Sequence, residues 1–290
     1  MDLVQVSSVR TPRTRDELTL APGEVFLGGG TWLYSEPQPD VTGVVDLTSM
    51  GWAPIERRRD GALRLSATCT LEQLHGLSFP EVSESGGETG GETRVEADCG
   101  LGGAAHPVFA QAVRSFLAGA KVWRTATVGG NLCFAAPASP IPALAALLDA
   151  SIRVWGPGGK RRIAADAFVT GAGRTALAAG ELVRAIDIPA AALASRTAWR
   201  RIALAPLGRA GVFAGGRREA SGLTVIMIAG ARTRPGVLRF ERMPAPDELA
   251  EAVGSLGDWY ADPHGSPDWR RAMAVRLAEE VRFELAGAGA

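Results

Sequence analysis

Two glycine clusters, each at the end of an apolar run, constrain the fold of this 290-residue chain more than any other feature. Residues 28–30 follow the strand-like run 24–27, and residues 129–130 follow the run 124–128. Glycine makes up 36 residues of the chain, well above its usual share of about 7%. Because glycine has no Cβ, such positions either loosen a chain or let its backbone approach another group closely. The placement of these clusters at the ends of apolar runs favours close approach.

Both clusters could present several backbone N–H groups to one anion, which is the property of a phosphate or diphosphate site. Neither has the G-x-G-x-x-G spacing of a Rossmann fingerprint, and the chain has no G-x-x-x-x-G-K-[ST] motif. Hydrolysis of a nucleoside triphosphate therefore has no support. Taken singly, each cluster is explained more simply as a tight loop. A third cluster, 86–93, lies in the acidic, weakly periodic stretch 79–106, which we expect to be a solvated surface loop without function.

The rest of the chain alternates between runs typical of strands and runs typical of helices. We expect strands over residues 44–47, 63–67, 152–155, 182–188 and 223–228, and helices over 70–77, 107–117 and 142–150. The final helix has the strongest signals, because Ser266 can cap it and Pro267 suits its first turn. Apolar residues then repeat every four positions from Trp269, which predicts a face packed into the core.

A domain boundary is expected near residues 171–174, after which β-rich runs are followed by helices. This order predicts an α+β protein with a first unit over residues 1–175 and a smaller unit, an antiparallel sheet with helices, over 176–286.

Charge and hydropathy exclude several classes of function. Lys plus Arg and Asp plus Glu both number 31, so no net field exists to hold a nucleic acid. No apolar run reaches the roughly 18 to 20 residues that a spanning helix needs. The N-terminus has no basic stretch followed by an apolar one, which favours a cytoplasmic location.

Cysteine and histidine are too scattered to indicate a metal site or a nucleophilic catalyst. The residues concerned are Cys69, Cys99, Cys133, His75, His106 and His264. The chain also lacks a G-x-S-x-G elbow. We therefore assign no metal ligand and no catalytic residue.

The two glycine segments together resemble a known family. Residues 27–33 resemble an A-G-G-T-x-L loop, and residues 124–131 resemble an R-x-x-A-T-[IV]-G-G-N loop. Both loops occur in the medium, FAD-binding flavoprotein subunits of molybdenum hydroxylases, the xanthine dehydrogenase and carbon monoxide dehydrogenase family. Weaker matches at 44–47, 181–189 and 262–271 extend the resemblance over nearly the whole chain.

The resemblance implies a fold and a set of cofactor contacts. It implies a PCMH-type, vanillyl-alcohol-oxidase-like FAD domain of two subdomains over 1–175, followed over 176–286 by a domain like the C-terminal one of carbon monoxide dehydrogenase flavoproteins. FAD would bind non-covalently between the two subdomains, with its diphosphate held by backbone N–H groups and a threonine hydroxyl. The implied contacts are Leu27, Gly28, Gly29, Gly30, Thr31, Trp32, Leu33, Leu117, Thr127, Gly129, Gly130, Asn131, Val183 and Arg200.

The same resemblance implies an oxidoreductase subunit that passes electrons from iron–sulfur clusters to NAD, oxygen or a quinone. Its partners would be a molybdopterin-binding large subunit and a 2Fe-2S small subunit. Two alternatives stay open: a stand-alone flavin-dependent oxidoreductase acting on a small molecule, and a scaffold that has lost the cofactor.

Three departures and ambiguities accompany the match. Pro140 stands where relatives commonly carry an aspartate that binds cofactor hydroxyls, so either FAD binds more weakly or Ser139 takes over that contact. The segment 201–209 also lacks the polarity usual in the family. The basic runs 57–59 and 160–162 are expected to be solvated hairpin tips, with docking of a partner subunit as the alternative.

Overall fold

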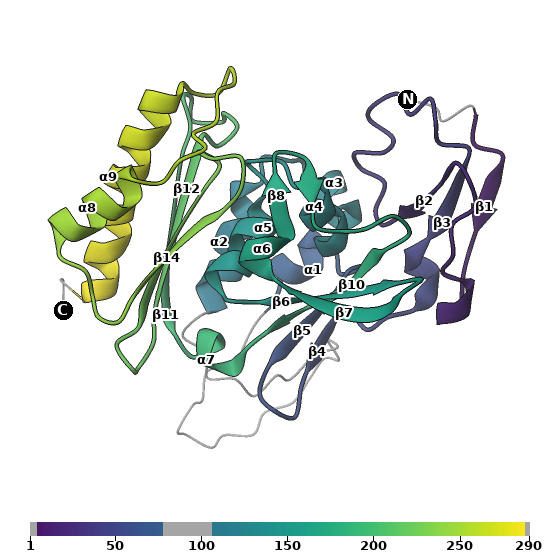
Figure 1. Ribbon diagram of the computed structural model, residues 1–290, viewed down its shortest axis with the longest axis horizontal. Helices are drawn as coiled ribbons and strands as arrows, with labels where there is room; N and C mark the ends of the chain where they lie inside the picture. Colours follow the sequence, from purple (N-terminus) through teal and green to yellow (C-terminus); the bar gives the residue numbers. More distant parts are fainter. Residues whose placement is uncertain (1–4, 78–105, 288–290) are drawn as a thin grey trace, which may run out of the picture.

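The computed structural model describes residues 5–77 and 106–287 and shows an α+β protein built from layers. Along its longest axis, Figure 1 shows two C-terminal helices, a four-stranded sheet, a group of central helices, a five-stranded sheet and a small N-terminal sheet. The α+β class expected from the sequence is confirmed. In the described ranges, no helix is long and apolar enough to cross a membrane.

The N-terminal sheet is small and parallel, in the order β1-β3-β2. Its strands and the two short 3-10 helices are β1 (Ser8–Arg10), η1 (Arg15–Glu17), β2 (Glu24–Leu27), β3 (Gly43–Asp46) and η2 (Leu47–Met50). A minor core of Leu18, Val45, Leu47 and Leu182 joins it to the next sheet.

The second sheet is antiparallel, in the order β4-β5-β10-β6-β7. Its strands are β4 (Ile55–Arg57), β5 (Leu63–Ser66), β6 (Ser151–Gly156), β7 (Gly159–Ala164) and β10 (Leu182–Ile188). Its neighbours include α1 (Leu71–His75), α2 (His106–Ser115), α3 (Ala120–Thr125), α4 (Val128–Phe134), α5 (Pro140–Leu147), α6 (Ala165–Phe168) and the pair β8 (Val169–Gly171) and β9 (Arg174–Thr175).

The C-terminal unit is a four-stranded antiparallel sheet in sequence order. After the short α7 (Ala190–Leu193) come β11 (Arg196–Ile202), β12 (Val212–Arg218), β13 (Thr224–Ala229), β14 (Gly236–Phe240), α8 (Pro246–Gly254) and α9 (Pro267–Ala286). Ser266 caps α9 by accepting a hydrogen bond from the N–H of Trp269, and Pro267 occupies its first turn. The capped helix that the sequence predicts after Ser266 is therefore confirmed.

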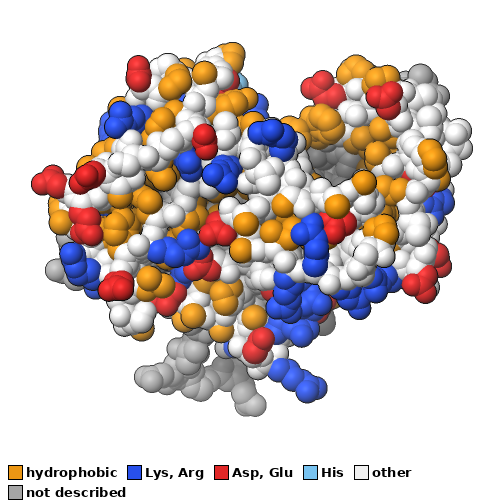
Figure 2. Space-filling view, viewed as in Figure 1, with side chains coloured by type: hydrophobic (Ala, Val, Ile, Leu, Met, Phe, Trp, Pro, Cys, Tyr) orange, Lys and Arg blue, Asp and Glu red, His pale blue; other side chains and the backbone are white. Residues whose placement is uncertain are grey.

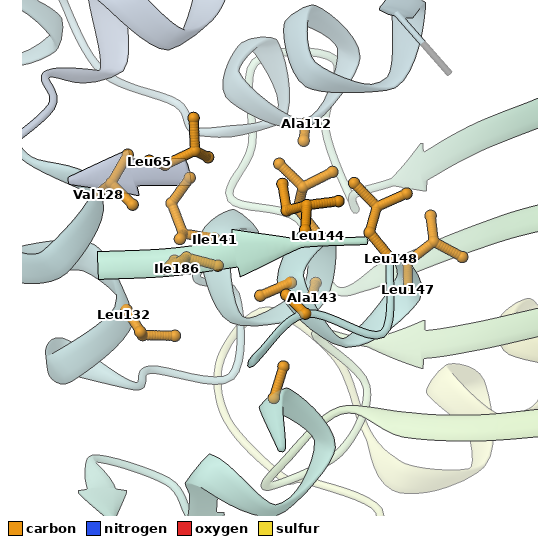
Figure 3. Packing of buried hydrophobic residues seen from close by; sticks show 14 of the residues in the cluster. Leu65, Ala112, Val128, Leu132, Ile141, Ala143, Leu144, Leu147, Leu148 and Ile186 are labelled. Atoms are coloured by element: carbon orange, nitrogen blue, oxygen red, sulfur yellow. The ribbon is translucent and has the colours of Figure 1, made fainter. Parts of the chain in front are cut away.

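Helix α5 is the centre of the main core. Every residue of its sequence PIPALAAL is buried, and it contacts β12 and β13 as well as the other central helices. Figure 3 shows Ile141, Leu144 and Leu147 of this helix among side chains from α2, α4 and the second sheet. A helix that is apolar on all sides is stable only when it is covered on all sides. The two sheets therefore depend on one shared hydrophobic layer.

Strand pairing bears on the expected boundary at residues 175 and 176. Strand β10 follows that position but lies between β5 and β6, in the middle of the sheet built by the first unit. A strand cannot be separated from a sheet in which both its edges are paired. The hydrogen bonding favours a boundary after Ile188, and a β-rich run in a sequence does not reveal such partners.

The second glycine segment is not the loop that the sequence suggests. Helix α3 ends at Thr125, Thr127 is an N-cap, and Gly129 and Gly130 lie in the first turn of α4. Glycine destabilises a helix. Here the Thr127 cap and the hydrogen bonds that the first turn of α4 donates to the carbonyls of Ala67 and Cys69 offset that cost. The strands expected at 63–67, 152–155 and 182–188 are observed within a residue or two.

Arg217 on β12 connects the C-terminal unit to the end of α5, and substituting it tests this junction. Its side chain is 2% exposed, its Nε donates to Leu147 O at 2.8 Å, and its other nitrogens pair with Asp149 and Glu219. Because Arg217→Ala leaves these acceptors without their donor, we expect a loss of about 3 kcal/mol in the free energy of unfolding, measured by urea denaturation. The exposed Arg276→Ala should change it by less than about 0.5 kcal/mol. Equal effects of the two substitutions would contradict this role.

Candidate functional site

A cavity of about 610 Å³ lies between the N-terminal sheet and the segment from the end of α2 to α4. Figure 2 shows a hollow in this region, between the small N-terminal lobe and the rest of the molecule. Its volume is in the range of cofactor and small-molecule sites. The described residues that line it belong to three segments, 25–41, 116–134 and Gly173.

The two glycine segments meet at this cavity. A Cβ on Gly28 would lie 2.7 Å from Thr127 Oγ1, and a Cβ on Gly29 would lie 1.7 Å from Thr125 O. Both distances are far below van der Waals contact, so only glycine permits this approach. Segments about a hundred residues apart in sequence therefore form one site, as the sequence analysis expects.

The first glycine segment offers unused donors. It turns sharply, with Gly30 at φ +70°, and is closed by hydrogen bonds from Tyr34 N–H to Gly30 O and from Ser35 N–H to Trp32 O. The N–H groups of residues 29–32 have no acceptor among the described residues. Unpaired N–H groups beside a cavity are costly unless water or a ligand accepts from them. This turn is therefore the part of the site best suited to a diphosphate.

The second glycine segment has already used the donors that its sequence suggests. The N–H groups of Val128 and Gly129 donate to Cys69 O and Ala67 O, each at 2.8 Å, and that of Gly130 donates to Thr127 Oγ1 at 3.0 Å. A Cβ on Gly129 would lie 2.6 Å from Ala67 Cβ, so this glycine allows α4 to pack on the end of β5. What α4 can offer a ligand is the Thr127 hydroxyl proton and the open side of Gly130.

Asn131 links the cavity to α5. Its Oδ1 accepts from the N–H of Ile141, at 3.1 Å, in the first turn of that helix. The residue is 7% exposed and lines the cavity. With the oxygen engaged in this way, the amide N–H groups are the polar part of Asn131 that a ligand can use.

The walls of the cavity are apolar and aromatic. Trp32 of the first glycine segment and Phe134 at the end of α4 pack with their rings tilted and their centroids 5.4 Å apart. Phe26, Val41, Phe116 and Val122 add further apolar surface, and none of the described lining residues is charged. An anion in this cavity would be held by N–H and O–H dipoles without repulsion from a carboxylate. A planar aromatic ligand would find surfaces to stack against.

Four of the residues implied by the resemblance are not in the lining. Leu117 is 52% exposed while its neighbour Phe116 lines the cavity, and Val183 is buried in β10 opposite Val154. Arg200 on β11 pairs with Glu280 and Glu284 of α9. Gly129 faces Ala67, as described above. Pro140, the departure from the family pattern, is buried at the start of α5 and is also absent from the lining.

A second, smaller cavity of about 270 Å³ shares Phe134 and Gly173 with the first. Its lining includes the C-terminal residues Arg209, Tyr260 and Asp262. Sequence reasoning missed these positions, together with Phe26, Gln38, Val41, Phe116, Val122 and Phe134 of the first cavity. Apart from their proximity to a glycine cluster, nothing in the sequence of these residues signals a binding surface.

Cys133 lines the first cavity as an inert thiol. Burial raises the pKa of Cys133, and likewise that of Cys69, to about 12. Neither thiol is in a disulfide. In the described part of the chain, no three His, Cys, Asp or Glu residues gather closely enough to hold a metal ion.

The fold and the cavity define a class: an α+β protein with an uncharged cavity of cofactor size between a glycine turn and a capped helix. Residues 13–191 match the family model described as "FAD binding domain in molybdopterin dehydrogenase". This match covers more than half of the chain, so the chain belongs to that family, and FAD is its cofactor.

Individual relatives agree with this assignment. The chain is 26% identical over 188 residues to the carbon monoxide dehydrogenase medium chain of Hydrogenophaga pseudoflava, a stretch that covers 60% of this chain and 65% of that relative. In fold it resembles the carbon monoxide dehydrogenase structure from Oligotropha carboxidovorans, with TM-score 0.78, 22% identity and 98% of both chains covered. It also resembles quinoline 2-oxidoreductase from Pseudomonas putida 86, with TM-score 0.76, 19% identity and 99% of both chains covered. The expected fold is confirmed.

The raised pKa of Cys133 predicts low reactivity. Because so little thiolate exists at pH 8, we expect iodoacetamide to modify Cys133 roughly a thousandfold more slowly in the native protein than in 8 M urea. Peptide mapping by mass spectrometry gives the rate at this position, with buried Cys69 as an internal control. A labelling rate in the native protein within about tenfold of the rate in urea would show that the Cys133 thiol ionises in the folded state and would contradict the prediction.

Proposed function

We propose that this chain is the FAD-carrying electron-transfer subunit of a molybdopterin-dependent dehydrogenase or hydroxylase. One observation carries the proposal most directly: an uncharged cavity in which a glycine turn with unused N–H donors packs against the N-cap of α4. Family membership and the medium-chain relative support the same role.

The residues present fit FAD. The N–H groups of residues 29–32 and the Thr127 hydroxyl would hold the diphosphate, since a phosphate prefers a set of converging donors. Leu27, Gly28, Leu33, Gly130 and Asn131 would complete the surface around it, all of them in the lining. Trp32 and Phe134 offer aromatic surface to the ring systems. The Asn131–Ile141 hydrogen bond holds one of these contacts in place through the buried α5.

The chemistry required of the protein side chains is limited. FAD when bound supplies the redox chemistry, and the protein binds, orients and shields it. No acid or base lines the first cavity among the described residues, and electron transfer through a bound flavin requires none of the protein. We therefore name no catalytic residue for this chain.

The partners belong to the proposal. The medium-chain name of the relative from Hydrogenophaga pseudoflava implies larger and smaller companions. We propose a molybdopterin-binding large subunit and a 2Fe-2S small subunit, with NAD, oxygen or a quinone as the terminal acceptor. A cytoplasmic location is part of the same proposal and is supported by the free thiols of Cys69 and Cys133, the two cysteines that the structure describes.

Gly130 allows a clean test of where the diphosphate binds. A Cβ there would meet only Thr127 Oγ1, at 3.0 Å, so a side chain can extend without colliding with the backbone. We expect Gly130→Asp to weaken FAD binding about a hundredfold, or roughly 2.7 kcal/mol, because a carboxylate would face the diphosphate. The measurement is a fluorescence titration of the apoprotein with FAD.

Gly130→Asn is the matched control, since it adds nearly the same volume without charge, and its loss should stay within about tenfold. Gly129→Asp is less informative, because a Cβ at Gly129 collides with Ala67 and disturbs packing as well. If the Asp and Asn variants at position 130 bind FAD equally, the diphosphate lies elsewhere.

The electron-transfer role makes a second prediction. The chain purified without partners should show flavin absorption at about 370 and 450 nm. The same preparation should oxidise no aldehyde or heterocycle. Co-expression with the two proposed partner subunits should restore dehydrogenase activity. Substrate turnover by the isolated chain would favour a stand-alone oxidoreductase, and absence of flavin would favour a cofactor-free scaffold.

A further inference from the structure

The second sheet has one face in the core and one face that carries charge. Its buried residues, among them Leu65, Ile152 and Ile186, point toward the central helices. Figure 1 shows the helices α1 to α6 gathered on that side. Figure 2 shows Lys and Arg side chains gathered on the underside of the molecule, where Figure 1 places β4, β5 and β7.

The strand register places cations next to one another on this outer face. Residues directly opposite in neighbouring strands point to the same side of a sheet. Arg153 lies opposite Arg162, and Trp155 lies opposite Lys160, across β6 and β7. Like charges in direct opposition are destabilising. The carboxylate of Asp187 lies within 4 Å of both arginines and offsets only part of this repulsion.

The acidic residues of the face do not balance these cations. Asp187 is shared by three arginines, Arg64 at 2.7 Å, Arg153 at 3.4 Å and Arg162 at 3.9 Å. Glu56 adds one weak contact to Arg64, at 3.9 Å. The side chain of Arg162 is 63% exposed and remains available.

Trp155 lies at the centre of this excess of positive charge. The cationic groups of Arg15, Lys160 and Arg184 lie 5.5, 5.6 and 5.4 Å from its ring centroid. Arg184 also stacks on Trp52, at 4.1 Å. None of these three cations forms an ion pair with a described residue. We call Arg15, Lys160, Arg162, Arg184 and Trp155 the basic patch.

Two buried donors of the basic patch lack acceptors. Arg184 Nη1 and Trp155 Nε1 are both shielded from solvent and have no hydrogen-bond partner among the described residues. The pKa of Arg184 is lowered by burial and by the neighbouring charges of Arg64 and Arg153, although Glu56 and Asp187 partly oppose the change. A partner cannot reach these two covered atoms, but they show that the patch holds its cations without compensating acceptors. The exposed charges of Arg15, Lys160 and Arg162 are the ones that a negatively charged partner can contact.

From this arrangement we infer that the basic patch is the docking surface for an acidic face of a partner protein, which contacts it through carboxylates. Tryptophan and arginine are the residue types that dominate protein interfaces. The cations extend from η1 across β6, β7 and β10, a spread that suits several carboxylates on a surface better than one small anion. The identity of that partner as a companion subunit rests on the proposed function.

Docking here would also involve the N-terminal lobe. Arg15 belongs to this lobe, which forms one wall of the cavity through residues 25–41, whereas Lys160 and Arg184 belong to the second sheet, which does not line the cavity. A partner bound to the basic patch would therefore join the second sheet to the lobe that carries one cavity wall.

The test uses Lys160→Glu/Arg162→Glu in the full chain. Both residues are exposed on β7 and lie outside the cavity lining. Poly-L-glutamate serves as a carboxylate probe, followed through tryptophan fluorescence, and assembly with the co-expressed large and small subunits is followed by size-exclusion chromatography. We expect the double variant to bind the probe about tenfold or more weakly and to fail to assemble, with flavin content unchanged.

The control is Arg242→Glu/Arg276→Glu, which makes the same change in net charge on exposed arginines of the C-terminal unit. It should bind poly-L-glutamate and assemble as the unaltered chain does. Equal behaviour of the two double variants overturns the inference, and so does tighter binding of a single-stranded DNA oligonucleotide than of poly-L-glutamate. If the unaltered chain does not assemble but binds the probe through these residues, the proposed function fails and the docking surface stands.

Discussion

The cavity depends on one contact, the packing of the turn at residues 28–30 against the backbone of residues 125–127. A side chain at Gly29 would occupy the position of Thr125 O, so this approach is possible only without a Cβ. The contact brings unused N–H donors beside the Thr127 hydroxyl and closes an uncharged space between them. Dipoles fixed by the fold can hold a diphosphate without lysine or arginine, because their orientation requires no rearrangement when the anion arrives.

A second dependence runs through α5. This helix is buried on every side. The second sheet and the C-terminal sheet both contribute side chains to the core around it, and the neighbouring helices cover the rest. Its N-terminus is tied to the cavity by Asn131, and its C-terminal carbonyl at Leu147 is tied to β12 by Arg217. The C-terminal unit and the cofactor cavity thus share one rigid element. The cavity wall at Asn131 is consequently connected through α5 to the contact between Leu147 and β12.

Local sequence predicted most of the elements correctly. Alternation identified β5, β6, β10 and β13, and capping residues identified α9, because these signals act within a few residues. The helical state of Gly129 and Gly130 was missed, since it depends on the carbonyls of Ala67 and Cys69, sixty residues earlier. The expected boundary at 175 preceded β10 for the same reason: the pairing of that strand with β5 and β6 is a long-range property.

The sequence alone determined the α+β class, the importance of both glycine segments and the family that they indicate, because glycine spacing and hydrophobic periodicity are written directly in the chain. Only the tertiary structure decided which donors are free. It shows that the N–H groups of Val128, Gly129 and Gly130 have acceptors within the protein and that Arg200 pairs with α9. It also shows that Phe116, rather than Leu117, reaches the cavity. Whether a polar group is available to a ligand depends on what the fold places within about 3 Å of it, and that distance is set by packing between segments far apart in the chain.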